Sequence, residues 1–193
     1  MHRKIHPLVG FAVLSAGVLS SSTLSSAAVL VKYEFTADAT SLVPTTTGSG
    51  VTSANILSAS GLSKQGSGVN FTGSSGPRVL GWQGSGTISG NLSEALTANH
   101  YFTFTLTPTA GQKMDLTNLT FFSNVGGTAL VPRTLELQVS TDGTNFNSAG
   151  TQTLAFDDLS STALFNMSLA AYSGVSTQTT FRIALYDLER DNV

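Results

Sequence analysis

In the sequence YFTFTLT (Tyr101–Thr107), phenylalanine or leucine alternates with tyrosine or threonine along the whole length. In an extended chain, successive side chains point to opposite faces, so Phe102, Phe104 and Leu106 share one face. Tyrosine and threonine side chains occupy the other face. The stretch therefore predicts a β-strand with one side buried in a hydrophobic core.

The same period of two recurs along the chain between turn residues. It predicts strands at Val29–Phe35, Val51–Ser60, Val69–Phe71, Val79–Trp82, Leu116–Phe122, Thr134–Ser140 and Thr180–Tyr186. In the last two strands, the side chains expected to point away from the core are Glu136, Gln138, Arg182 and Ala184. Short strands separated by turn signals favour an all-β fold, an antiparallel β-sandwich of the jelly-roll-like kind.

Two short segments carry local signals. Leu92–Ala98 is a helical candidate, opened by Asn91 as a cap and followed by Glu94 at the position of a capping box. Asp142-Gly143 supplies residues that accept positive φ angles. This pair predicts a tight hairpin turn, after which Phe146 returns to the core.

The composition limits the class of protein. The chain has 193 residues, of which 40% are hydrophobic and 10% are charged. This length suits one domain with its own core, and the charged fraction is well below the ~25% of an ordinary soluble domain. Hydroxyl side chains must therefore form much of the surface. The chain contains no cysteine, so core burial has to hold the fold together without disulfides.

The N-terminus has the pattern of a secretory signal peptide. Two basic residues precede the apolar stretch Leu8–Leu19, and the small residues Ser25–Ala28 follow it. The apolar stretch is too short to span a bilayer, which takes ~20 residues. We expect residues 1–28 to be a signal peptide and residues 29–193 to be a single exported domain without a membrane span.

The charge pattern argues against a nucleic-acid partner. Without the predicted leader, seven Lys and Arg residues stand against eleven Asp and Glu residues, a net charge of about −4. The basic residues occur singly along the chain. Binding to a phosphate backbone requires a basic patch, which this distribution does not supply.

Residues suited to catalysis are sparse. The chain has no cysteine nucleophile, and His100 is the one histidine outside the predicted leader. No GxSxG-like motif accompanies it, so we expect His100 at a strand edge or on the surface. One histidine is too few for a zinc site. The sequence therefore predicts a protein that is not an enzyme, although a pair of carboxylates brought together by folding stays open.

Two groups of residues are candidates for ligand binding. Three carboxylates would share one face of an extended stretch and attract calcium, with a solvated surface as the alternative; they are Asp187, Glu189 and Asp191. Aromatic candidates for stacking on a sugar ring are Trp82, Tyr101 and Tyr172. Glycines flank Trp82, and a role as a core residue is its alternative. No cofactor other than calcium is expected.

Several of these segments together resemble a known family. They are LVKYEF (Leu30–Phe35), SLVP (Ser41–Pro44), Val51–Ser53, YFTFTLTP, AGQKMDLTNLTF, LELQVSTDGTNF and the closing TFRIALY with DNV (Asp191–Val193). The chain resembles the secreted β-sandwich domain of bacterial proteins that bear a PEP-CTERM sorting signal. The likeness extends from Val29 to Val193 and is carried by strand and turn patterns.

The resemblance implies a jelly-roll-like sandwich, export by the general secretory route, and retention at the envelope by an exosortase. The C-terminal sorting signal of that family is missing here, so we expect a domain truncated at its C-terminus, with a complete protein of different anchoring as the alternative. Together with the composition, this predicts a non-catalytic structural or adhesive protein of the envelope or extracellular matrix of a Gram-negative-type bacterium. Its expected partners are extracellular polysaccharide or other matrix components. The alternatives are a carbohydrate-binding module and, third, a polysaccharide-acting enzyme.

Overall fold

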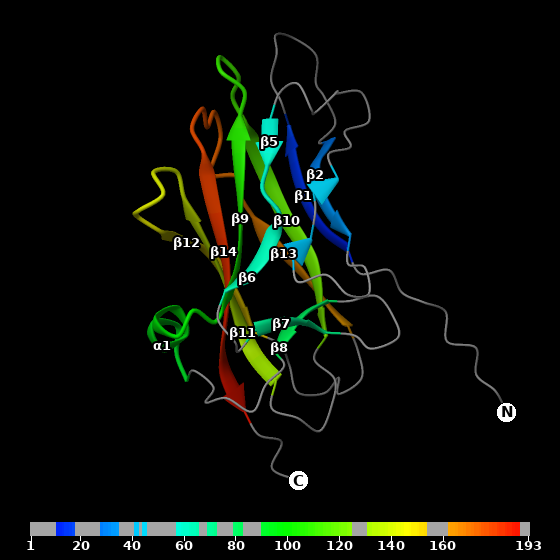
Figure 1. Ribbon diagram of the computed structural model, residues 1–193, viewed down its shortest axis with the longest axis vertical. Helices are drawn as coiled ribbons and strands as arrows, with labels where there is room; N and C mark the ends of the chain where they lie inside the picture. Colours follow the sequence, from blue (N-terminus) through cyan, green and yellow to red (C-terminus); the bar gives the residue numbers. More distant parts are fainter. Residues whose placement is uncertain are drawn as a thin grey trace, which may run out of the picture.

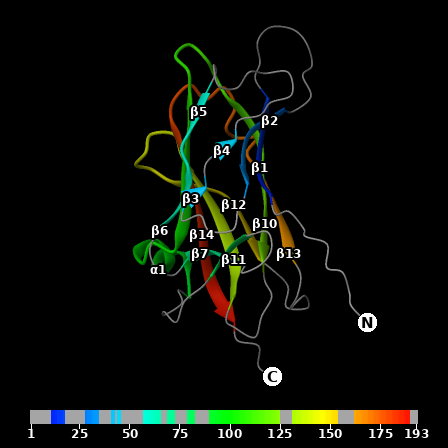
Figure 2. The same cartoon turned by 45° about the vertical axis from the view of Figure 1, so that its right-hand side comes forward.

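The protein is an antiparallel β-sandwich, which confirms the predicted all-β fold. The computed structural model describes residues 11–17, 28–34, 41–42, 44–45, 57–65, 69–72, 79–82, 90–124, 131–153 and 162–189. These residues form two sheets that lie as separate layers in both views (Figures 1 and 2). Helix is limited, within these ranges, to one short segment.

The first sheet has seven strands in the order β4-β2-β1-β10-β8-β7, with β13 also paired to β10. A bridge between Ser123 and Leu80 joins β10 to β8 in parallel, and the other pairs are antiparallel. The strands are β1 (Phe11–Gly17), β2 (Ala28–Glu34), β4 (Pro44–Thr45), β7 (Val69–Thr72), β8 (Val79–Trp82), β10 (Asp115–Asn124) and β13 (Thr162–Ser168).

The second sheet has seven strands in the order β12-β11-β14-β9-β6-β3, with β5 also paired to β9. In its centre, β14 lies between β11 and β9, and this register places Arg182 opposite both Gln138 and Thr103. The strands are β3 (Ser41–Leu42), β5 (Leu57–Ala59), β6 (Leu62–Gln65), β9 (Tyr101–Pro108), β11 (Val131–Ser140), β12 (Asn147–Thr153) and β14 (Thr179–Glu189).

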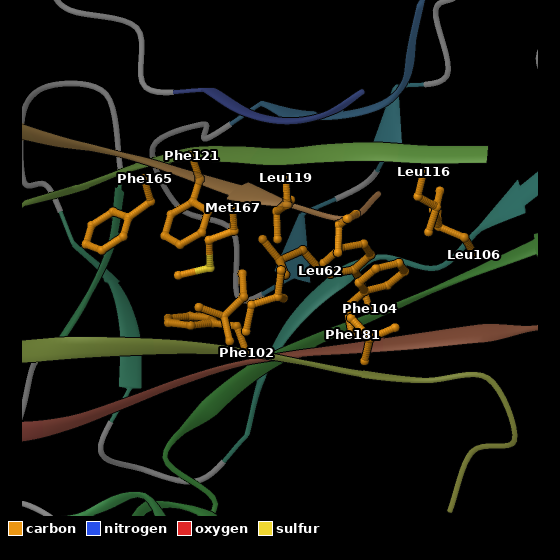
Figure 3. Close-up of a cluster of buried hydrophobic side chains, with 14 of the residues drawn as sticks. Leu62, Phe102, Phe104, Leu106, Leu116, Leu119, Phe121, Phe165, Met167 and Phe181 are labelled. Carbon is orange, nitrogen blue, oxygen red and sulfur yellow. The ribbon is translucent and has the colours of Figure 1, made fainter. Parts of the chain in front are cut away.

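The core lies between the two sheets and is rich in phenylalanine (Figure 3). As the alternation predicts, the inward residues of β9 are buried and those between them are half-buried. Phe104 of β9 stacks on Phe181 of β14 with ring centroids 4.6 Å apart, and Phe121 of β10 stacks on Phe165 of β13 at 4.9 Å. Each stacked pair joins neighbouring strands of one sheet, and the two sheets contribute one pair each.

Helix α1 (Leu92–Thr97) begins with the predicted cap. The side-chain oxygen of Asn91 accepts a hydrogen bond from the Glu94 N–H at 3.0 Å, and the Glu94 carboxylate accepts one from the Gly90 N–H at 2.8 Å. A helix this short has little stability of its own. The cap and the packing of α1 against β14 therefore have to hold it in place.

We expect the substitution Asn91→Ala to lower the free energy of unfolding by about 1 kcal/mol, because it leaves an N–H at the helix start without its acceptor. Urea denaturation followed by tryptophan fluorescence measures the change. Asn91→Asp keeps an acceptor at the same place and should retain most of the stability. Equal losses in the two variants would show that the cap does not stabilise the fold.

Part of the predicted signal peptide is a strand in the full chain. β1 pairs with β2 on one side and with β10 on the other. Cleavage after residue 28 would remove β1 and leave β2 and β10 without this shared neighbour. Whether the leader is removed stays a prediction. In the described part of the chain, no helix has the length and apolar character to cross a membrane.

Candidate functional site

On the outer face of the second sheet, turned away from the core, strand pairing brings polar side chains of five strands into two rows. One row across five strands consists of Ser63, Thr103, Arg182, Gln138 and Ser148. A second row beside it consists of Gln65, Tyr101, Ala184, Glu136 and Thr151. At ~4.8 Å between strands, each row extends over roughly 19 Å.

Arg182 lies in contact with two aromatic rings on this face. Its guanidinium carbon is 3.5 Å from the ring centroid of Phe146 and 5.0 Å from that of Tyr101. Tyr101 belongs to β9 and Phe146 follows β11, so the rings approach Arg182 from the two sides of β14. Among the described residues, none accepts a hydrogen bond from the guanidinium or forms an ion pair with it. The planar cation is thus positioned by rings, and its N–H donors are free to bind a ligand.

Gln138 lies directly across from Arg182 on β11. Its side chain is 7% exposed, and its carbonyl oxygen is enclosed without a hydrogen-bond partner among the described residues. Arg182 stacks on Phe146 and does not donate to this acceptor. A buried acceptor without a donor costs about 1–3 kcal/mol. The cluster of Tyr101, Gln138, Phe146 and Arg182, which we call the Arg182 cluster, therefore carries an unmet hydrogen bond at its centre.

Glu136 and Tyr186 lie beside the Arg182 cluster on the same face. Glu136 is 7% exposed and accepts a hydrogen bond from the Tyr186 hydroxyl at 3.4 Å. Burial raises the pKa of Tyr186, and the nearby Glu136 carboxylate raises it further. The carboxylate is thus engaged by tyrosine rather than by Arg182.

The predicted outward residues of β11 and β14 do point away from the core, but three of them are buried all the same. Glu136, Gln138 and Ala184 occupy the outer face and are buried there. Helix α1 contacts β14 and lies on this side of the second sheet, as does the loop between β11 and β12 (Figures 1 and 2). These segments and the aromatic side chains partly cover the face.

The loop that delivers Phe146 differs from the predicted tight turn. β11 ends at Ser140 and β12 begins at Asn147, so six residues connect them. Gly143 has the expected positive φ of 77°, whereas Asp142 does not. The longer loop turns Phe146 back onto the outer face, where it stacks on Arg182 instead of entering the core. The prediction of a core position for Phe146 is therefore wrong.

The Asp142 carboxylate organises this loop. It accepts hydrogen bonds from the N–H groups of Asn145 at 2.7 Å and Thr144 at 2.8 Å, from the Asn145 side chain at 2.7 Å and from the Ser140 hydroxyl at 2.9 Å. These bonds, led by that from the Asn145 backbone, hold the pKa of Asp142 well below its ordinary range. The ionised carboxylate therefore fixes the position from which Phe146 reaches Arg182.

We expect Asp142→Ala to lower the stability of the protein at neutral pH, with a loss that disappears in acid. A carboxyl group whose pKa is lower in the folded state stabilises that state above its ordinary pKa of 3.8. This stabilisation is lost as the pH falls below that value. The measurement is the urea midpoint of both proteins at pH 7 and in steps below pH ~4. A gap between the two midpoints that widens in acid would contradict this role.

The aromatic candidates from the sequence do not form one platform. Tyr101 is half-buried in the Arg182 cluster, and its hydroxyl donates to the Asn99 side chain at 3.3 Å. Tyr172 lies in the loop after β13, where its backbone carbonyl accepts from Leu116 at the start of β10 and its ring packs against the core. Burial raises the pKa of Tyr172. Trp82 is the last residue of β8, and its side chain lies outside the described residues.

Of the three predicted calcium ligands, the structure describes the side chain of one, Asp187. Asp187 has a positive φ of 59°, so the extended geometry on which the prediction depends does not hold there. Its carboxylate accepts a hydrogen bond from the Thr134 hydroxyl at 3.3 Å. The Glu189 side chain and Asp191 lie outside the described residues. Within the described ranges, no group of three or more His, Cys, Asp or Glu side chains could hold a metal ion.

His100 was predicted at a strand edge or on the surface; it lies at the edge of a strand, directly before β9, but it is not on the surface. It precedes β9 and is buried, and its carbonyl accepts a hydrogen bond from the Leu185 N–H at 3.1 Å. Burial lowers the pKa of the imidazole. The packing of α1 and β14 around the start of β9 explains the difference.

Fold and site together define a β-sandwich whose second sheet presents a polar, aromatic-lined outer face. Comparison with models of known protein families, with curated proteins and with solved structures finds no match for this chain.

Proposed function

We propose that this protein is a non-catalytic, exported protein with an adhesive role in the bacterial envelope or extracellular matrix, and that it binds polysaccharide through the outer face of the second sheet. The observation that carries the proposal is the Arg182 cluster, in which two rings flank a planar cation on a hydroxyl-rich face. Such a surface offers both apolar contact and hydrogen bonds, the combination that sugar rings require.

The hydroxyl groups of the first row support this proposal by the direction of their hydrogen bonds. Thr103 donates to the Phe181 carbonyl at 2.9 Å, and Ser63 donates to the Thr103 carbonyl at 3.4 Å. Each hydroxyl has therefore used its one proton on the sheet and retains acceptor capacity, of which Ser63 uses part to accept from the Gln65 side chain at 3.2 Å. Sugar hydroxyls are suitable donors to such acceptors.

Export is the second part of the proposal and rests on the N-terminal pattern of basic, apolar and small residues. Expression of residues 1–193 with a C-terminal tag in a Gram-negative host should yield a periplasmic product that begins near Ala28 or Val29. Intact-mass measurement identifies the first residue. A product that keeps residues 1–28 in the cytoplasm would contradict export.

Affinity electrophoresis in gels that contain one polysaccharide each tests the binding. We expect at least one acidic or neutral polysaccharide to retard the wild-type protein. Tyr101→Ala should reduce the retardation, and Tyr101→Phe, which keeps the ring, should preserve it. Tyr172→Phe serves as the control outside the site. Absence of retardation in every gel would refute the binding role, and release of new reducing ends would refute the non-catalytic one.

A further inference from the structure

We infer that the polysaccharide bound by this face is acidic and that the Arg182 guanidinium pairs with a carboxylate of its sugar units. This inference rests on the proposed function and specifies the class of ligand. It depends on three features of the described residues, namely the free donors of Arg182, the rings that position it and the neutral polar groups on both sides of it.

The geometry of Arg182 suits a carboxylate. Guanidinium N–H groups lie in the plane of the group, and they match the two oxygens of a carboxylate in a bidentate pair. The rings of Phe146 and Tyr101 contact the guanidinium at 3.5 Å and 5.0 Å from its central carbon. Held in this way, the side chain loses little further freedom when it binds, which favours affinity.

The enclosed carbonyl oxygen of Gln138 is an independent indication of a binding site. It lies across from the one cation in the two rows, and yet it has no donor among the described residues. A structure arranged for stability would let Arg182 donate to Gln138. Here the aromatic rings position the guanidinium instead, and the buried acceptor stays unpaired. Such a departure from the most stable arrangement is expected at a binding site.

The surroundings favour an acidic polysaccharide over a polyphosphate or a nucleic acid. Apart from Arg182, the first row contains hydroxyl and amide groups, namely Ser63, Thr103, Gln138 and Ser148. A single cation cannot neutralise a phosphate backbone. It can pair with one carboxylate while the hydroxyl groups bind the neutral remainder of the same sugar chain. The rows extend over roughly 19 Å, which leaves room for several sugar units.

The whole chain has a formal net charge of −2. Long-range attraction therefore does not draw a polyanion to the protein, and any binding has to come from a local site. Among the described residues, Glu136 makes no ion pair with Arg182, and its carboxylate accepts a hydrogen bond from the Tyr186 hydroxyl.

The test compares binding to polygalacturonate and to the same polymer after its carboxyl groups have been reduced to alcohols. Isothermal titration should show about tenfold or greater preference of the wild-type protein for the acidic polymer. Arg182→Met should abolish the preference, and Arg182→Lys should lose most of it, because an ammonium group cannot form the bidentate pair. Lys113→Met removes the same charge from an exposed loop residue and should leave both affinities unchanged.

The outcomes separate the two proposals. Equal binding to both polymers would overturn the acidic class and leave polysaccharide binding in place. Binding to neither polymer, together with no binding to other polysaccharides, would overturn both. If Lys113→Met and Arg182→Met lost the preference for the acidic polymer equally, total charge rather than this cluster would determine that preference. Circular dichroism of each variant verifies that the sandwich is folded.

Discussion

Replacing Phe181 with alanine is expected to lower the free energy of unfolding by about 3–5 kcal/mol, because the change leaves a cavity in the middle of the core. Phe181 is fully buried, and its ring stacks on Phe104 with an interplanar angle of 7°. It belongs to β14, the strand that pairs with both β9 and β11. A domain of ordinary stability, about 5–15 kcal/mol, would lose a large part of it.

Urea or thermal denaturation measures this loss, with two companion variants. Phe181→Leu retains much of the buried area and should cost clearly less than Phe181→Ala. Thr180→Val changes the neighbouring residue, whose side chain is on the other face, and should alter the free energy of unfolding by about 0.5 kcal/mol or less. A Phe181→Ala protein as stable as Thr180→Val would show that the two sheets do not share this core.

The sequence predicted the strands of the core where one face is apolar and the other is polar. β9 and β14 follow this rule, and both were predicted with the correct inward residues. β12 was missed because it is largely exposed, and its sequence NSAGTQT has no apolar face. β13 was missed although Phe165 and Met167 alternate in it. The neighbouring Leu164, 51% exposed, obscured that pattern.

The candidate site was harder to predict, because it depends on the pairing of distant strands. Alternation correctly placed Arg182 and Tyr101 on outer faces, but it carries no information on register between β14 and β9. Phe146 was assigned to the core because an aromatic residue after a turn is ordinarily buried there. Its position depends on a six-residue loop held by Asp142, which neither the Asp-Gly pair nor the hydrophobic pattern specifies.

Replacing Gln138 with methionine is expected to raise the free energy of unfolding by about 1–2 kcal/mol, because it removes a buried acceptor that has no donor. Methionine has nearly the same length and flexibility, so it should fill the same space beside Arg182. Gln138→Glu is the matched control variant. It retains the shape but places a carboxylate near Glu136, which repels it, and across from Arg182, which attracts it, so it should not give the gain expected of Gln138→Met.

Denaturation of the wild-type protein and both variants under one set of conditions checks these signs. A higher free energy of unfolding in Gln138→Met would show that glutamine at this position destabilises the fold. Polar residues of a binding surface often do so. A loss would mean that the amide stabilises the outer face, and the argument from Gln138 for a ligand at Arg182 would fail. The geometry of the guanidinium between its two rings would then be the remaining support for the acidic ligand.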